Sequence, residues 1–135
     1  MPPLTRWFLK AALVYLILAL CTGILLALPD TTPIAGLFPV YFHLLTFGWL
    51  TQLIFGVALW MFPTYSPTTP RGPEWLGWST FALLNTGLIL RMIFEPWNGT
   101  AASALTGWML VIAALLQWLA GVTFVANTWK RVRVK

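Results

Sequence analysis

Charged side chains are scarce in this sequence, and their scarcity excludes most classes of soluble protein. Only 8% of the 135 residues are charged and 59% are hydrophobic, whereas a soluble domain normally carries roughly a quarter charged residues. The mean hydropathy of +0.82 is correspondingly high. So few charges cannot cover the core of a water-soluble globule. The composition therefore predicts an integral membrane protein and excludes a soluble enzyme.

Cysteine and histidine each occur once. The single cysteine, Cys21, excludes an internal disulfide. One cysteine and one histidine, His43, cannot supply a zinc site of the Cys/His type from a single copy of the chain. A metal site with several such ligands therefore needs other residues or a second chain.

Long hydrophobic runs make up most of the sequence. A helix needs about 20 mostly apolar residues to cross the hydrocarbon of a bilayer, and four such runs occupy residues 7–28, 37–62, 75–94 and 103–127. Residues that end helices or favour turns occur in the three short breaks, which are residues 29–36, 63–73 and 95–102. Short loops predict antiparallel neighbours. We therefore expect an all-α integral membrane protein whose single domain, residues 1–135, is an antiparallel bundle of four transmembrane helices.

The basic residues predict the orientation of this bundle, because loops on the cytoplasmic side are enriched in Lys and Arg. Seven of the eight basic residues fall on the side of the termini and the second loop, and they are Arg6, Lys10, Arg71, Lys130, Arg131, Arg133 and Lys135. Asp30 and Glu95 fall on the other side. We therefore expect both termini in the cytoplasm and the bacterial inner membrane as the location. The basic tail is expected to meet anionic lipid rather than nucleic acid.

Polar residues inside the predicted spans are costly and usually face another helix or a cavity. Gln52, Asn85 and Gln117 each fall near the middle of a span. These amides are expected either to hydrogen-bond across helices or to line a polar or proton path. Gly48, Gln52 and Gly56 recur every four residues, which predicts a face where a neighbouring helix approaches closely.

His43 is predicted on a different line of the second helix. At about 100° per residue this line lies opposite the glycine stripe, and it also carries Phe47, Leu50, Ile54 and Val57. The spacing alone leaves two interpretations of the imidazole. It is either a hydrogen-bonded structural residue or a porphyrin ligand above an apolar, aromatic wall.

Arg91 is an ionised residue about one turn inside the outer end of the third helix. The spacing allows an ion pair with Glu95, four residues on. The guanidinium is equally suited to an anionic group such as a heme propionate. A further alternative is Cu(I), because Cys21, His43, Met92 and Met109 in the outer half of the bundle are soft ligands, although Met and Cys are also ordinary packing residues.

The segment from Phe42 to Pro63 carries a recurring pattern. It contains His-x4-Gly-Trp, then Ile-x-Gly, then Phe-Pro, at His43, Gly48-Trp49, Ile54-Phe55-Gly56 and Phe62-Pro63. This pattern resembles the second helix of the catalytic subunits of heme-copper oxidases and nitric oxide reductases, and of NnrS-like heme membrane proteins. In the oxidase family that helix runs from the outer side inward, and a histidine near its outer end ligates the low-spin heme. The resemblance implies that His43 ligates a b-type heme.

The remaining site residues follow from this heme expectation. Arg91 is expected near a propionate, and Phe47 and Trp49 are expected to wall the cofactor. The chain departs from the family in having four predicted helices rather than many more. The further histidines that complete the low-spin heme and hold the active-site heme and metal have no counterpart here. Reduction of oxygen or nitric oxide by this chain alone is therefore not expected.

The expected function is electron transfer, or the handling of heme or of a gas such as O2 or NO, by a membrane-embedded heme protein. We expect a homo-oligomer or a partner within a membrane complex, because one histidine per chain allows two copies to share a bis-histidine heme. The main alternative is a cofactor-free accessory or assembly subunit. A third hypothesis is a copper-handling membrane protein.

Overall fold

The computed structural model describes residues 1–29, 34–68 and 70–132. Over these residues the chain is helical and contains no strand. The elements are α1 (Pro3–Ala27), α2 (Leu37–His43), the π-helix η1 (Leu44–Thr51), α3 (Gln52–Met61), α4 (Glu74–Thr100) and α5 (Ala104–Thr128). α2, η1 and α3 follow one another without a break, so four helices result that are long and apolar enough to cross a membrane. Asp30, Arg133 and Lys135 of the orientation prediction lie outside the described residues.

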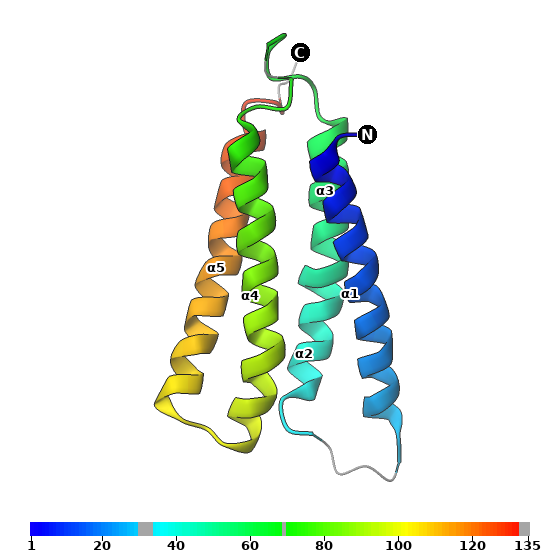
Figure 1. Ribbon diagram of the computed structural model, residues 1–135, viewed down its shortest axis with the longest axis vertical. Helices are drawn as coiled ribbons and strands as arrows, with labels where there is room; N and C mark the ends of the chain where they lie inside the picture. Colours follow the sequence, from blue (N-terminus) through cyan, green and yellow to red (C-terminus); the bar gives the residue numbers. More distant parts are fainter. Residues whose placement is uncertain (30–33, 69, 133–135) are drawn as a thin grey trace.

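The four long helices run up and down as two pairs (Figure 1). α1 lies beside the continuous rod of α2, η1 and α3, and α4 lies beside α5. The N-terminus, the end of α3, the beginning of α4 and the end of α5 lie at one end, which we call the terminal end. α1 ends, α2 begins and α4 turns into α5 at the opposite end, which we call the far end.

The glycine face of the second long helix packs against α1, as the sequence predicts. A Cβ atom added to Gly48 would lie 2.8 Å from Cβ of Tyr15, and one added to Gly56 would lie 2.8 Å from Cβ of Phe8. Side chains at these two positions would overlap α1. The close approach of the two helices therefore depends on both glycines.

α4 continues beyond the end that the sequence predicts. The expected break at residues 95–102 is wrong over its first six residues, because the helix passes through Pro96 and ends at Thr100. The hydroxyl of Thr100 donates to the carbonyls of Pro96 and Trp97, at 3.2 and 3.0 Å. Pro96 has no N–H, so the carbonyl it leaves without its helical donor is that of Met92, four residues earlier, and the helix nevertheless continues past it. Glu95 consequently lies in the helix and not in a loop.

The π-helix η1 changes the direction in which the side chains around it point. Its i→i+5 hydrogen bonds take more residues into each turn than an α-helix does, so each residue advances by a smaller angle. His43 and Gln52 consequently both reach α4, through Glu95 and Asn85 respectively. The expectation that His43 lies opposite Gln52 is therefore wrong, whereas Gly48 and Gly56 face α1 and not α4.

Aromatic rings join the two helix pairs. The ring of Phe8 on α1 meets that of Phe81 on α4 edge to face, with centroids 5.1 Å apart. The rings of Phe55 on α3 and Phe124 on α5 are stacked, with centroids 3.9 Å apart. These contacts, together with buried Leu44, form part of one apolar core that all four long helices share.

Arg131, just beyond α5, binds the end of α3. Its side chain is 2% exposed, and it donates to the carbonyls of Leu59, Phe62 and Pro63 at 3.1, 2.8 and 2.9 Å. The last carbonyls of a helix have no partner within the helix, and a cation is favourable there. Burial, together with the positive charge of Arg71, lowers the pKa of the Arg131 guanidinium. Arg131 thereby links the residues just after α5 to the end of α3.

Candidate functional site

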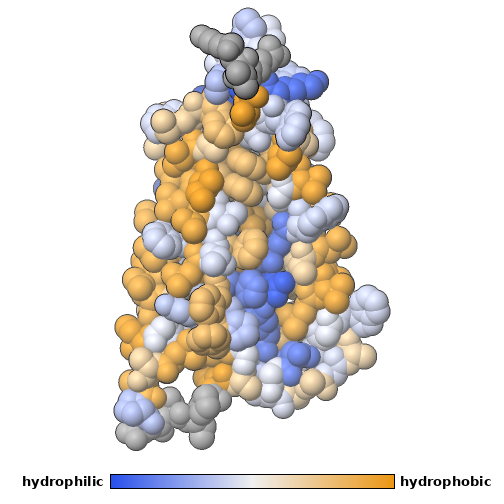
Figure 2. Space-filling view, turned by 180° about the vertical axis from the view of Figure 1, so that it is seen from behind, coloured by the Kyte–Doolittle hydropathy of each residue, from blue (hydrophilic) through white to orange (hydrophobic). Residues whose placement is uncertain are grey.

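A band of hydrophilic residues runs lengthwise between apolar flanks on the side of the molecule seen in Figure 2. Most of the large side chains exposed elsewhere are hydrophobic. Within the described residues, His43 on α2 lies beside Glu95 on α4, and Arg91, also on α4, binds the same carboxylate. We take these three residues, with Gln117, as the candidate site.

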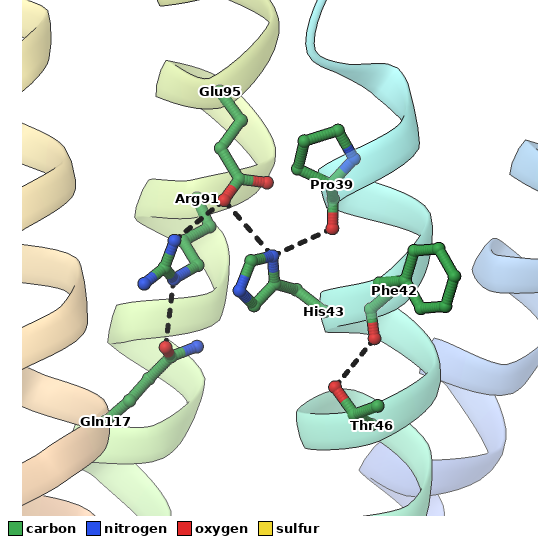
Figure 3. Close-up of polar contacts among 7 residues, drawn as sticks. All are labelled: Pro39, Phe42, His43, Thr46, Arg91, Glu95 and Gln117. Carbon is green, nitrogen blue, oxygen red and sulfur yellow. Dashed lines mark hydrogen bonds and ion pairs between the residues drawn. The ribbon is translucent and has the colours of Figure 1, made fainter.

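Glu95 on α4 is the centre of the site (Figure 3). Its Oε1 lies 2.7 Å from Nη1 of Arg91 and 3.1 Å from Nδ1 of His43. The carboxylate is 7% exposed, and its other oxygen, Oε2, has no hydrogen-bond partner in the part of the chain that the structure describes. One buried carboxylate therefore connects α2 to α4.

The position of His43 determines the state of its ring. Nδ1 lies 2.8 Å from the carbonyl oxygen of Pro39, one turn earlier, as well as beside Glu95. Both neighbours accept hydrogen bonds, so Nδ1 carries a proton, an assignment made from its partners. In the neutral ring the lone pair is then on Nε2, for which the described residues provide no partner. The imidazole is stacked on Phe47, with ring centroids 5.9 Å apart and planes at 24°.

Arg91 extends the site to α5. Its Nε donates to Oε1 of Gln117 at 2.9 Å, while Nη1 binds Glu95. The sequence allows Arg91 to pair with Glu95 or with a heme propionate, and the pair with Glu95 is present in the structure. Binding of a propionate stays a prediction, for which Nη2 is the atom not engaged by the described residues. Nε2 of Gln117 is buried without a partner there.

Two of the three amides within the predicted spans hydrogen-bond each other across helices, which is one of the two expectations from the sequence. Gln52 and Asn85 exchange hydrogen bonds of 3.1 and 3.3 Å between α3 and α4. Asn85 also donates to the carbonyl of Phe81 at 2.7 Å. Gln117 binds Arg91 instead of another amide. Gln52 and Asn85 therefore link these helices.

The other predicted ligands are spread over different elements. Trp49 is partly buried on η1, and Cys21 is an exposed free thiol on α1. Met92 packs against the apolar core, and Met109 is partly buried on α5. Within residues 1–29, 34–68 and 70–132, no three His, Cys, Asp or Glu residues are grouped so that they could hold a metal ion.

Glu95 is the site residue whose role the sequence left open. Glu95 falls in the predicted break at residues 95–102, so the sequence does not predict its contact with His43. Its spacing from Arg91 was the available signal, since residues four apart on a helix are neighbours. The sequence likewise does not predict the hydrogen bond between His43 and the Pro39 carbonyl. Every residue has a backbone carbonyl, so no residue type marks it as a partner.

The site thus contains an imidazole whose Nδ1 is hydrogen-bonded and whose Nε2 is available to a ligand. A histidine that ligates a metal almost always donates its other ring N–H to a carboxylate, a backbone carbonyl or water. Glu95 and Pro39 supply two of these groups to Nδ1. Comparisons with protein-family models, with curated proteins and with solved structures found no match.

Proposed function

We propose that this chain is an integral membrane protein that binds a b-type heme through Nε2 of His43. The observation that supports it best is the orientation of the ring, with Nδ1 fixed by Pro39 and Glu95 and Nε2 left available. The resemblance of residues 42–63 to the heme-ligating helix of the oxidase family supports the same residue.

The surroundings of His43 fit a porphyrin. The side chain is 24% exposed, so Nε2 is not sealed within the bundle. Phe47 stacks on the imidazole and is itself exposed, as is Leu50, on the rod formed by α2, η1 and α3. Such apolar surface suits a macrocycle, and a π-helical segment such as η1 is frequently found at functional sites.

The other residues have roles in holding the heme. Glu95 and Pro39 fix the ring of His43, and Phe47 and Trp49 contribute aromatic surface. Arg91 holds a propionate through its remaining guanidinium nitrogen, Nη2. A bound heme would supply reversible one-electron exchange at its iron, which suits electron transfer or the handling of heme, O2 or NO. The single histidine favours a homo-oligomer in which two copies of His43 ligate one heme, or a complex with another membrane subunit.

Membrane orientation is part of this proposal. The apolar helices are long enough to span, and basic residues gather at the terminal end, where Arg6, Arg71 and Lys130 lie. The positive-inside rule then places both termini in the cytoplasm of a bacterial inner membrane. His43 would lie toward the outer side. Reporter fusions to each terminus test the orientation, since a reporter active only outside the cytoplasm must stay inactive at both.

One observation favours a second function, that of a cofactor-free accessory or assembly subunit. Arg91 and Glu95 already bind each other, and with His43 and Gln117 they join α2, α4 and α5. Such a cluster has a structural use without any ligand. Copper handling has less support, because Met92 packs in the apolar core.

Heme stoichiometry separates these functions. The full chain is expressed with ample heme, purified in detergent and assayed by pyridine hemochrome, with copper measured on the same sample. One heme per chain supports a site formed within each chain, and one heme per two chains supports a site formed between two copies. Absence of heme from a folded protein contradicts the proposal, and copper in its place would favour the third function.

A further inference from the structure

A hollow of about 230 Å³ lies on the surface of the first turns of α1, which begins at the terminal end (Figure 1). Pro3, Arg6, Trp7 and Lys10 line it. Their spacing of i, i+3, i+4 and i+7 places them on one face of the helix. The hollow is several times larger than the about 30 Å³ that a water molecule occupies in the liquid. It therefore has room for a phosphate group.

Two cations border this hollow without a counter-charge. The side chains of Arg6 and Lys10 are exposed, and they make no hydrogen bond or ion pair within the described part of the chain. The described acidic residues, Glu74 and Glu95, do not line the hollow. Like charges four residues apart on a helix repel each other. An anion bound between Arg6 and Lys10 would therefore be attracted by both.

The two charged groups can reach the same depth of a bilayer. Lys10 lies four residues further along α1 than Arg6, so its backbone is about 6 Å farther from the terminal end. Both residues belong to a helix that is long and apolar enough to span a membrane. A lysine near the end of such a helix extends its flexible stem back toward the head groups. The ammonium of Lys10 can therefore meet the same phosphate as the guanidinium of Arg6.

Trp7 forms an aromatic wall of the hollow. Its ring meets that of Phe81 on α4 edge to face, with centroids 6.4 Å apart, and the residue is nevertheless 56% exposed. Tryptophan is enriched where head groups meet hydrocarbon, because its ring is apolar and its N–H is a hydrogen-bond donor. Trp7 therefore suits a hollow at the level of the lipid head groups.

The same face of α1 continues as an apolar surface. Leu13, Val14 and Ile17 follow Lys10 at i+3, i+4 and i+7, and each is more than half exposed. Acyl chains can lie along this surface while a phosphate is held at its basic end. A free phosphate ion would use the basic end alone, so the face as a whole fits a phospholipid.

From these features we infer that the hollow lined by Arg6, Trp7 and Lys10 binds one anionic phospholipid. The phosphodiester accepts hydrogen bonds from both cations, and the acyl chains lie along α1. The inference rests on membrane insertion, which is part of the proposed function, and not on heme. His43→Ala should therefore bind the lipid as the wild type does.

The test is a titration of the full chain in a neutral detergent with dioleoyl phosphatidylglycerol, in which native mass spectrometry counts the bound lipids. The protein is extracted from alkali-washed membranes, so insertion is established before lipid binding is measured. We expect one tightly bound phosphatidylglycerol per chain. Dioleoyl phosphatidylcholine should bind about tenfold more weakly, because its choline group is repelled by the two cations.

Arg6→Gln and Lys10→Gln each remove one cation from the hollow. Each should weaken binding of phosphatidylglycerol about fivefold, and the double variant about twentyfold to thirtyfold. The melting temperature should not fall, because neither side chain has a partner in the described part of the protein. Arg71→Gln is the matched control, since it removes the same charge from an exposed residue at the terminal end that does not line the hollow. This control should bind the lipid as the wild type does.

Four results would overturn the inference. Equal losses of affinity in Arg6→Gln and Arg71→Gln would reduce the effect to overall charge, and equal affinities for the two lipids would remove the selectivity. Displacement of the lipid by millimolar inorganic phosphate would assign the hollow to a free anion. Absence of the chain from alkali-washed membranes would refute insertion itself, whereas a lack of heme alone would leave lipid binding unchanged.

Discussion

Oε1 of Glu95 lies 3.1 Å from Nδ1 of His43, and this contact joins α4 to α2. The same oxygen binds Arg91, so a negative charge buried in an apolar bundle has a positive partner on its own helix. With Nδ1 held by Glu95 and Pro39, the free nitrogen of the imidazole is Nε2. The geometry thus combines a helix-linking network with one available ligand atom.

The Arg91–Glu95 pair should couple energetically. Removing one partner leaves a partly buried charge without compensation, so Glu95→Ala and Arg91→Ala should each lower the free energy of unfolding by about 2 kcal/mol. The double variant should lose about 1 kcal/mol less than the sum of the single effects. Denaturant unfolding in mixed micelles measures all four proteins. Strict additivity would show that the contact contributes nothing.

Arg91→Ala should also reduce heme retention without abolishing it. The iron ligand His43 remains in this variant, while the guanidinium proposed to hold a propionate is gone. The measurement is the rate of heme transfer to an excess of apomyoglobin, compared with that of Gln117→Ala. Gln117→Ala removes a partner of Arg91 but keeps the charge. A rate unchanged by Arg91→Ala would leave Arg91 with its structural role alone.

The amide pair between Gln52 and Asn85 should stabilise the bundle modestly. Gln52→Leu leaves Asn85 with one fewer partner and should cost about 1 kcal/mol of unfolding free energy. Gln52→Leu/Asn85→Leu replaces both amides with apolar groups and should recover part of that loss. A double variant far less stable than Gln52→Leu would instead indicate that Asn85 has a further role.

Gly48 should tolerate no larger residue, unlike Gly121. A Cβ on Gly48 would overlap Tyr15, so Gly48→Ala should cost about 1 to 3 kcal/mol. A Cβ on Gly121 meets nothing within 4 Å. Gly121→Ala should therefore stabilise by about 0.5 to 1 kcal/mol through helix propensity. Thermal unfolding of the two variants in one detergent compares them, and equal shifts would refute the packing account.

Arg131 should be the basic residue that contributes most to stability at the terminal end. Arg131→Met removes the donor to three carbonyls and should cost about 2 to 3 kcal/mol. Arg131→Lys keeps the charge but loses the fork of donors, so it should recover only part of this. Arg6→Met, at an exposed residue, should change stability by less than about 0.5 kcal/mol. Similar losses of unfolding free energy for Arg131→Met and Arg6→Met would contradict a stabilising role for the contact between Arg131 and the end of α3.

The long helices could be predicted because hydrophobic runs and breaks are properties of the sequence itself. The second long helix, expected at residues 37–62, occupies Leu37–Met61. The predicted third helix ends too early, at residue 94, because proline and glycine in the following residues favour a helix end, whereas α4 continues through Pro96 to Thr100. The close approach at Gly48 and Gly56 was predicted, because small residues at regular spacing indicate such contacts.

The candidate site could be predicted only in part. Arg91 with Glu95 follows from helical spacing, and Gln52 with Asn85 follows from equal depth. The contact between His43 and Glu95 does not, because Glu95 falls in the predicted break at residues 95–102, whereas α4 continues to Thr100. The sequence predicts for Arg131 only a part in membrane orientation, with the rest of the basic tail, because its partners are backbone carbonyls that no sequence pattern marks.

The most direct test of heme ligation by His43 is a reduced-minus-oxidised absorption spectrum of the purified wild type beside His43→Ala. Circular dichroism first establishes that both proteins are folded. The proposal predicts the sharp bands of a b-type cytochrome in the wild type and their loss in the folded variant. The same bands at equal heme content in His43→Ala would contradict it.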